Sequence, residues 1–154
     1  MSAVHDEMRE TQEAILIVDA SSEDYEFTLR GLNLAGVRNP VHRCRDGDEA
    51  LDYLFRRGTY EDPEKSPRPC AVLLELNLPR TDGREVLREL KNDPVLKRIP
   101  VIVLTTSNDE RDVEGCYRAG ANSYIQKPVN IEGFFKAIQR LADYWFEVVT
   151  LPRL

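Results

Sequence analysis

The sequence predicts an α/β domain with a doubly wound sheet of five parallel strands and helices on both faces. Short, continuous apolar runs recur along the chain, as expected for strands buried on both faces. Segments with helical periodicity and capping residues separate these runs. With 154 residues the chain has room for one hydrophobic core, so we expect a single domain.

The first half of the chain contains two strand-and-helix units. Residues 14–18, AILIV, predict the first strand, and Ser21 and Ser22 offer N-caps for a helix that stops at a glycine. A shorter strand is predicted over 41–44. It leads through an Asp-Gly turn into a helix over 48–57, whose apolar residues form one stripe.

The connection over 58–69 separates these two units from the remaining three. It has three prolines, many charges and no periodicity, which predicts an exposed loop. Three more strands are predicted after it, and helical segments around 86–90 and over 113–119 lie between them. A long final helix is expected over 131–149. The three strands are 70–74, 99–104 and 123–126.

The composition excludes several classes of protein. The net charge of −6 argues against a nucleic-acid-binding surface, because phosphate binding needs clustered Lys and Arg. No apolar run is long enough to span a membrane, and the polar start of the chain is unlike a signal peptide. Cys44, Cys70 and Cys116 form no CxxC pair, which suits a reducing compartment. We expect a cytoplasmic protein that binds neither nucleic acid nor membrane.

The residues that close the strands are the candidates for function, because parallel strands end at one edge of the sheet. Asp19 follows the first strand and Glu75 the third. Thr105 closes the fourth strand and Lys127 the fifth. Two acids, a hydroxyl and a cation are therefore expected to converge there.

Four motifs around these residues resemble, in order, the motif set of response-regulator receiver domains: VDASSED, LLELNLPRTDG, VLTTS and YIQKP. The resemblance covers residues 14–143, after a polar extension over 1–13. It implies a flavodoxin-like fold with strand order 2-1-3-4-5. The long connection and the ending DYWFEVVTLPRL, largely residues 144–154, resemble the single-domain regulators of bacterial and cyanobacterial phytochrome kinases, or bacteriophytochromes.

The resemblance also implies a chemistry. In this family a kinase histidine passes a phosphoryl group to an aspartate after the third strand, with the help of Mg²⁺. Glu75 matches the phosphoacceptor position, Lys127 the cation that neutralises the phosphoryl oxygens, and Thr105 the hydroxyl that bonds one of them. Asp19 and the backbone carbonyl of Asn77 match metal ligands.

Two of these positions depart from the family pattern. Ala20 stands where a second acid normally binds the metal, so we expect a weak Mg²⁺ site. Glu75 replaces aspartate, and its extra methylene moves the carboxylate by roughly 1 Å, enough to cost about a hundredfold in an alignment-dependent reaction. We expect slow or absent phosphorylation at this degenerate site. Counting Asp19, Glu75 and Lys127, the site has a formal charge of −1.

Glu75 itself suggests a hypothesis about the resting state. Its longer side chain can contact Lys127 or Thr105 and so imitate part of the phosphorylated form, although a phosphoryl group has more charge and one more oxygen. Tyr124 matches the family's switch aromatic, whose inward or outward position follows the state of Thr105.

The expected partners are a sensor histidine kinase and a second copy of the chain. The last helix has two apolar stripes, more than one core needs, which favours a homodimer through the C-terminal region. The response is expected to pass through contacts of the fourth helix, fifth strand and fifth helix. The stripes are Phe134, Ile138, Leu141 and Trp145, and Phe135, Ala142, Phe146 and Val149.

The main hypothesis is thus a non-enzymatic, phosphorylation-independent signalling module in a light-sensing two-component phosphorelay. The alternative is a working phosphoacceptor that tolerates both substitutions. An aspartate-nucleophile phosphatase would need an acid two residues after Asp19, where Ser21 stands. A flavin carrier would need a phosphate-binding loop where the acids Glu23 and Asp24 lie.

Overall fold

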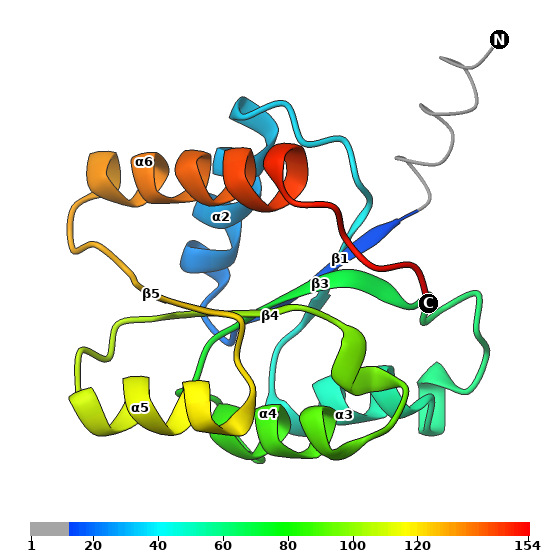
Figure 1. The fold of residues 1–154 in the computed structure, drawn as a ribbon. Helices are drawn as coiled ribbons and strands as arrows, with labels where there is room; N and C mark the ends of the chain where they lie inside the picture. The colour runs from blue at the N-terminus through cyan, green and yellow to red at the C-terminus, as the bar shows by residue number, and fades with distance from the viewer. Residues whose placement is uncertain (1–12) are drawn as a thin grey trace, which may run out of the picture.

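The computed structural model describes residues 13–154, so the predicted extension over 1–13 lies, except for Glu13, outside the described residues. One sheet of five parallel strands runs in the order β2-β1-β3-β4-β5 (Figure 1). The flavodoxin-like sheet order predicted from the sequence is confirmed. The strands are β1 (Ala14–Val18), β2 (Val41–Cys44), β3 (Pro69–Leu74), β4 (Val101–Thr105) and β5 (Ser123–Gln126).

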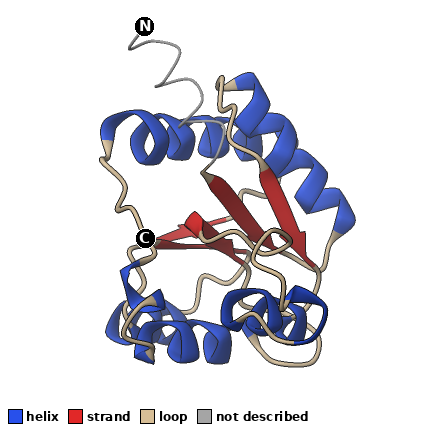
Figure 2. Cartoon of the chain, turned by 90° about the vertical axis from the view of Figure 1, so that its right-hand side faces the viewer, coloured by secondary structure: helices blue, strands red, loops and turns tan. Residues whose placement is uncertain are grey.

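Five α-helices cover the sheet in two layers, which are seen on either side of the strands in Figures 1 and 2. The helices α2 (Ser22–Leu34) and α6 (Ile131–Ala142) cover one face. On the opposite face, a cluster of buried hydrophobic residues joins the sheet to three helices. These are α3 (Gly47–Phe55), α4 (Gly83–Asn92) and α5 (Glu110–Ala119). The strands therefore pack on both faces, which explains their continuous apolar runs.

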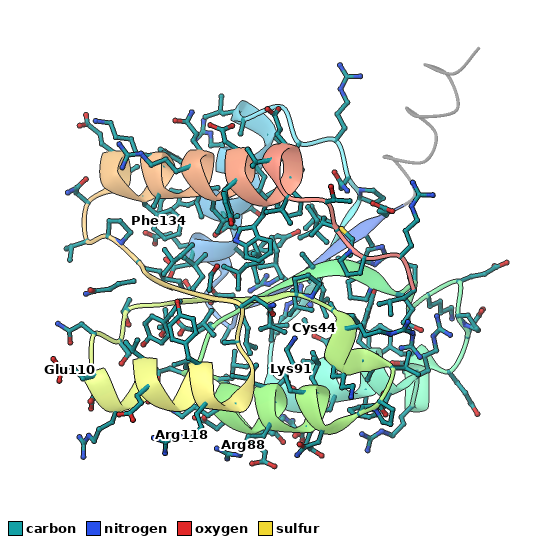
Figure 3. The ribbon with its side chains drawn as sticks, in the orientation of Figure 1. Cys44, Arg88, Lys91, Glu110, Arg118 and Phe134 are labelled. Carbon is teal, nitrogen blue, oxygen red and sulfur yellow. The ribbon has the colours of Figure 1, made fainter. Side chains whose placement is uncertain are left out.

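The side chains follow this layering (Figure 3). Phe134 of α6 lies between its helix and the sheet, whereas Arg88 of α4 and Arg118 of α5 lie on the outer side of their helices. The three cysteines are buried and unpaired. Within residues 13–154 no helix is both long enough and apolar enough to cross a membrane.

Polar caps set the starts of the five α-helices within residues 13–154. In each case the side chain just before the helix accepts a hydrogen bond from a backbone amide in the first turn. The helix α5 therefore begins at Glu110, three residues before the predicted start, because Asp109 caps it. The cap residues are Ser21, Asp46, Asp82, Asp109 and Asn130.

The connection over 58–69 is more ordered than its sequence suggested. It contains the short 3₁₀-helix η1 (Gly58–Tyr60), and Ser66 is fully buried. The Ser66 hydroxyl donates to the carbonyl of Tyr60 at 2.8 Å, and the Tyr53 hydroxyl donates to the carbonyl of Pro67 at 2.8 Å. The first bond closes the loop on itself, and the second fastens it to α3.

The end of the chain corrects one expectation. The helix α6 continues as a π-helix, η3 (Asp143–Val148), so the long final helix is present. Its second apolar stripe, however, is not free: Ala142 is buried and Phe135 stacks edge-on against Phe27 of α2 at 5.8 Å. Phe146 and Val149 also pack against the core. The stripe is covered because α2 lies alongside α6.

Gly31 permits this close packing of α2 on α6. A Cβ at Gly31 would lie 2.6 Å from Cγ2 of Ile138 and 2.8 Å from its Cβ. Ile138 is fully buried and β-branched, so it has little freedom to move aside. Gly115, in the middle of α5, has open space around the same position.

We expect Gly31→Ala to lower the free energy of unfolding by about 1–3 kcal/mol, because overpacking against Ile138 outweighs the gain in helix propensity. Gly115→Ala is the matched control and should raise it by about 0.5–1 kcal/mol. Urea unfolding followed by circular dichroism measures both variants. A stabilised Gly31→Ala variant would contradict the close contact.

An ion pair joins α4 to α5. Nε and Nη2 of Arg84 donate to the two carboxylate oxygens of Asp112 at 2.7 and 2.8 Å, and Nη1 donates to Asp82 at 3.1 Å. The hydrogen bonds from Arg84 and then Ser107 lower the pKa of Asp112 from 3.8 to about 2. A carboxylate with a lowered pKa stabilises the fold above its unfolded pKa, and this contribution is lost as the pH falls.

The stability of the protein should therefore decrease as the pH falls from about 4 to about 2, and Asp112→Asn should lose less stability over this interval. Arg84→Gln should also weaken the dependence of stability on pH over this interval, since it removes the partner that lowers the pKa of Asp112. Urea midpoints at a series of pH values test this. If both variants kept the slope of the unmodified protein, the pair would not be the cause.

Candidate functional site

The four predicted strand-end residues meet at the carboxyl edge of the sheet. The backbone ladder continues through them: the amide of Asp19 donates to the carbonyl of Cys44, and that of Glu75 to the carbonyl of Val18, each at 3.0 Å. The amide of Lys127 donates to the carbonyl of Thr105. The side chains of Asp19, Glu75, Thr105 and Lys127 are all buried. The fold thus gathers a buried polar cluster, called the pocket below, at the ends of β1, β3, β4 and β5.

Lys127 is the centre of this pocket. Its Nζ lies 2.8 Å from Oδ2 of Asp19 and 2.9 Å from Oε1 of Glu75. A third carboxylate completes the group, because Oδ2 of Asp24 also lies 2.9 Å from Nζ. A lysine ammonium has three N–H donors, so each donor has a carboxylate partner.

The third carboxylate changes the expected charge. The expected value of −1 counted only Asp19, Glu75 and Lys127, and with Asp24 the formal charge of the group is −2. The count missed Asp24, which lies on the first turn of α2 rather than at a strand end. A signal was present, since Asp24 closes the VDASSED motif, but a first-turn acid has a sufficient local role at the helix N-terminus.

The environment shifts the pKa values of the buried pair. Burial raises the pKa of Asp19, although the charge of Lys127 and a hydrogen bond from it act in the opposite direction. Burial alone would lower the pKa of Lys127, but the charge and hydrogen bond of Asp19, with Asp24 and Glu75, raise it above its ordinary value. The ammonium is therefore held in its charged form.

Glu75 folds back over its own loop instead of pointing to solvent. Its Oε2 accepts the amides of Leu76 at 2.7 Å and Asn77 at 3.3 Å, while Oε1 contacts Lys127. The loop is tightly packed, because a Cβ at Gly83 would collide with the carbonyl of Glu75. No hydrogen bond joins Glu75 to Thr105 within the described chain. Of the two contacts suggested for Glu75, only the one to Lys127 is present.

The oxygens around Lys127 do not fit a divalent cation as they are arranged. Asp19 already accepts the amide of Ser21 on Oδ1, at 2.9 Å, and the ammonium on Oδ2. Ala20 offers no side-chain ligand, and Asn77 offers only its backbone carbonyl. In the part of the chain that is described, no three His, Cys, Asp or Glu side chains are placed to hold a metal ion.

Thr105 and Tyr124 are joined through one residue, Ser107. The amide of Ser107 lies 3.4 Å from Oγ1 of Thr105, and its carbonyl accepts the Tyr124 hydroxyl at 2.9 Å. Its own hydroxyl donates to Asp112 at 2.6 Å. The ring of Tyr124 is half-buried against the cluster under α3, α4 and α5. The sequence predicts Thr105 and Tyr124 as a switch pair but gives no sign of Ser107, whose contacts depend on the tertiary structure.

Arg43 of β2 lies at the rim of the pocket. Its guanidinium donates to the carbonyl of Asp19 at 3.1 Å and stacks over the ring of Tyr25, 4.7 Å from the centroid. It thereby holds the backbone that presents Asp19. The sequence does not predict this contact, because a charged side chain in a short strand is usually explained by exposure to solvent.

Known proteins are similar to this chain in both sequence and architecture. The family described as Response regulator receiver domain matches residues 15–139. Response regulator Rcp1 of Synechocystis sp. is 44% identical over 138 residues, which cover 90% of this chain and 92% of Rcp1.

Solved structures agree. The Mn²⁺-bound form of Rcp1 has a TM-score of 0.86 and 43% identity, over 92% of this chain and 99% of that chain. The phosphorylated cyanobacterial phytochrome response regulator RcpA has the same TM-score and coverage, with 39% identity. The sequence match, the sheet order and the strand-end residues lead to one conclusion: the chain belongs to the response-regulator receiver domain family.

Proposed function

We propose that this chain is a signalling module of a phytochrome-type two-component pathway, acting through protein contacts rather than by carrying a phosphoryl group. The observation that carries the proposal is the arrangement around Lys127, whose donors are all bound to carboxylates of the chain itself. A phosphoryl group on the acceptor residue would need these donors. Asp19, Asp24 and Glu75 already use them.

In this proposal Glu75 holds the pocket in a partly activated state. Its carboxylate neutralises Lys127 from the position where the family has its acceptor aspartate. Thr105 and Tyr124 act as the switch pair, and Ser107 transmits their state to α5. Mg²⁺ binding is weak or absent, since Ala20 removes one ligand and both oxygens of Asp19 already accept, one from the Ser21 amide and one from the ammonium.

The expected partner is a sensor histidine kinase. Two relatives support a phytochrome-type kinase by their descriptions, RcpA as a phytochrome response regulator and AtBRR as a bacteriophytochrome response regulator; AtBRR is 42% identical. Beside Lys127 a cavity of about 320 Å³ opens, and Val129 and Ile131 project from its rim into solvent. An apolar rim around a charged pocket suits a partner that must approach the pocket closely.

The alternative function is that of a working phosphoacceptor. The Mn²⁺-bound Rcp1 and the phosphorylated RcpA favour it, because both are similar to this chain over most of its length. Enzyme activity is not part of either proposal: the position that a phosphatase acid would need is taken by Ser21, which caps α2. Nor do we propose nucleic-acid binding, given the net charge of −6, and the module is expected to act in the cytoplasm.

We further propose that residues 14–143 form the receiver and that 144–154 supply a homodimer contact. The second apolar stripe of the last helix is packed within the monomer and does not supply this contact. The exposed apolar residues at the end of the last helix are Tyr144 and Val148, which are 55% and 71% exposed. Such neighbouring side chains favour contact with a second copy.

Phosphorylation tests the main proposal. Incubated with acetyl phosphate and Mg²⁺, the unmodified protein should incorporate no acid-labile phosphate, because the donors of Lys127 are occupied and Glu75 is displaced by roughly 1 Å. The double variant Ala20→Asp/Glu75→Asp should be labelled. Scintillation counting after gel filtration measures both. Equal labelling of the two proteins would support the working phosphoacceptor instead.

Sedimentation velocity tests the dimer. The unmodified protein should sediment as a dimer at micromolar concentration, and Val148→Asp should convert it to a monomer by placing a charge in the contact. Val95→Asp is the matched control, since Val95 is an exposed valine on the other face of the sheet and should leave the dimer intact. A monomeric unmodified protein would refute the contact.

A further inference from the structure

Asp24 lies outside the strand ends, yet its carboxylate contacts the same ammonium as the two strand-end acids. It belongs to the first turn of α2, and its backbone is fixed from both sides. Its amide donates to the Ser21 hydroxyl at 3.1 Å, and its carbonyl accepts the Thr28 hydroxyl at 2.8 Å. The cap of α2 thereby sets where the Asp24 side chain begins, and its Oδ2 reaches Lys127 at 2.9 Å.

We propose that Asp24 is a positioning residue for Lys127 and the releasable member of the three carboxylates. It supplies the negative charge that Ala20 cannot, but from a helix instead of a strand end. The ammonium thus becomes the internal counter-ion of the pocket, in the place of a divalent cation. This inference rests on the proposed function, since it explains how Lys127 stays paired without a phosphoryl group.

Exposure distinguishes Asp24 from its two neighbours. The side chain of Asp24 is 30% exposed, whereas those of Asp19 and Glu75 are 6% and 8% exposed. Asp19 and Glu75 are also bound to backbone amides of their own loops, at Ser21 and Leu76. Asp24 can therefore rotate into solvent at the lowest cost, because water replaces its lost hydrogen bond.

The cavity beside Lys127 lies on the side of the ammonium where Asp24 would move. Asp24 and Lys127 both line it, together with the aromatic rings of Phe27 and Phe134. An anion entering through the cavity meets the Asp24 side of the ammonium first. When Asp24 turns away, one N–H of Lys127 becomes free and the local charge is less negative, and both changes favour an anion.

Glu23 provides the matched comparison. It is the neighbouring acid in the same first turn, it is exposed, and it is not among the ion-pair partners of Lys127 within residues 13–154. If both acids acted only on the helix N-terminus, replacing either one by its amide would have the same modest effect. The proposal instead requires that only Asp24→Asn alters Lys127.

The hydrogen exchange of the Lys127 ammonium, observed by ¹⁵N NMR, tests this directly. The unmodified protein should show a slowly exchanging ammonium signal that is missing in Lys127→Arg. Asp24→Asn should speed its exchange roughly tenfold, as expected for the loss of one charge-assisted hydrogen bond. Glu23→Gln should leave the rate unchanged. An unchanged rate in Asp24→Asn would overturn the proposal.

Binding of Mn²⁺, followed by the EPR signal of the free ion, is a second test. Lys127→Gln removes the internal counter-ion, so three unneutralised carboxylates should bind Mn²⁺ at least about tenfold more tightly than in the unmodified protein. Lys127→Gln/Asp24→Asn should lose this gain, and Lys127→Gln/Glu23→Gln should keep it. Loss of the gain in both double variants, or in neither, would contradict the role of Asp24.

The two proposals can fail separately. Neither the exchange rate nor Mn²⁺ binding involves a phosphodonor, so both remain readable if the unmodified protein proves to incorporate phosphate. In that case the proposed function would be wrong, while the position of Asp24 would still be decided by the ammonium signal.

Discussion

The site depends on keeping one buried ammonium charged. Removing a lysine from water costs several kcal/mol, which is offset only when opposite charges surround it in good geometry. Lys127 meets this condition with carboxylates from the ends of β1 and β3 and from the first turn of α2. The central strands, the β5–α6 loop and the cap of α2 must all be in place for it. The contacts of Lys127 therefore form only when these parts of the fold are correctly packed.

Much of this could be predicted from the sequence. Apolar runs and caps located the strands and helices, and the four strand-end residues followed from the geometry of parallel strands, which end at one edge. Asp24 could not be found in the same way, because a first-turn acid already has a sufficient local explanation in the helix dipole. Its contact with Lys127 joins residues far apart in the chain, and only the packing of α2 reveals it.

Two features depend on contacts that a sequence pattern does not show. The second apolar stripe of α6 was expected to face a partner, since periodicity identifies apolar positions but not what covers them; Phe27 of α2 covers Phe135. Residues 61–65 of the proline-rich connection are exposed, as expected, but Ser66 is buried because its hydroxyl bonds backbone carbonyls. Composition predicts the absence of regular structure in such a segment, but it does not predict whether the segment is anchored.

Ser107 has a mechanical consequence for the edge of the sheet. Its amide, hydroxyl and carbonyl meet three different elements: Thr105 of β4, Asp112 of α5 and Tyr124 of β5. A single residue of the loop between β4 and α5 thus links these two elements and β5. Because one residue makes all three contacts, a rotation of Ser107 would change its distances to Thr105, Asp112 and Tyr124 together rather than one at a time.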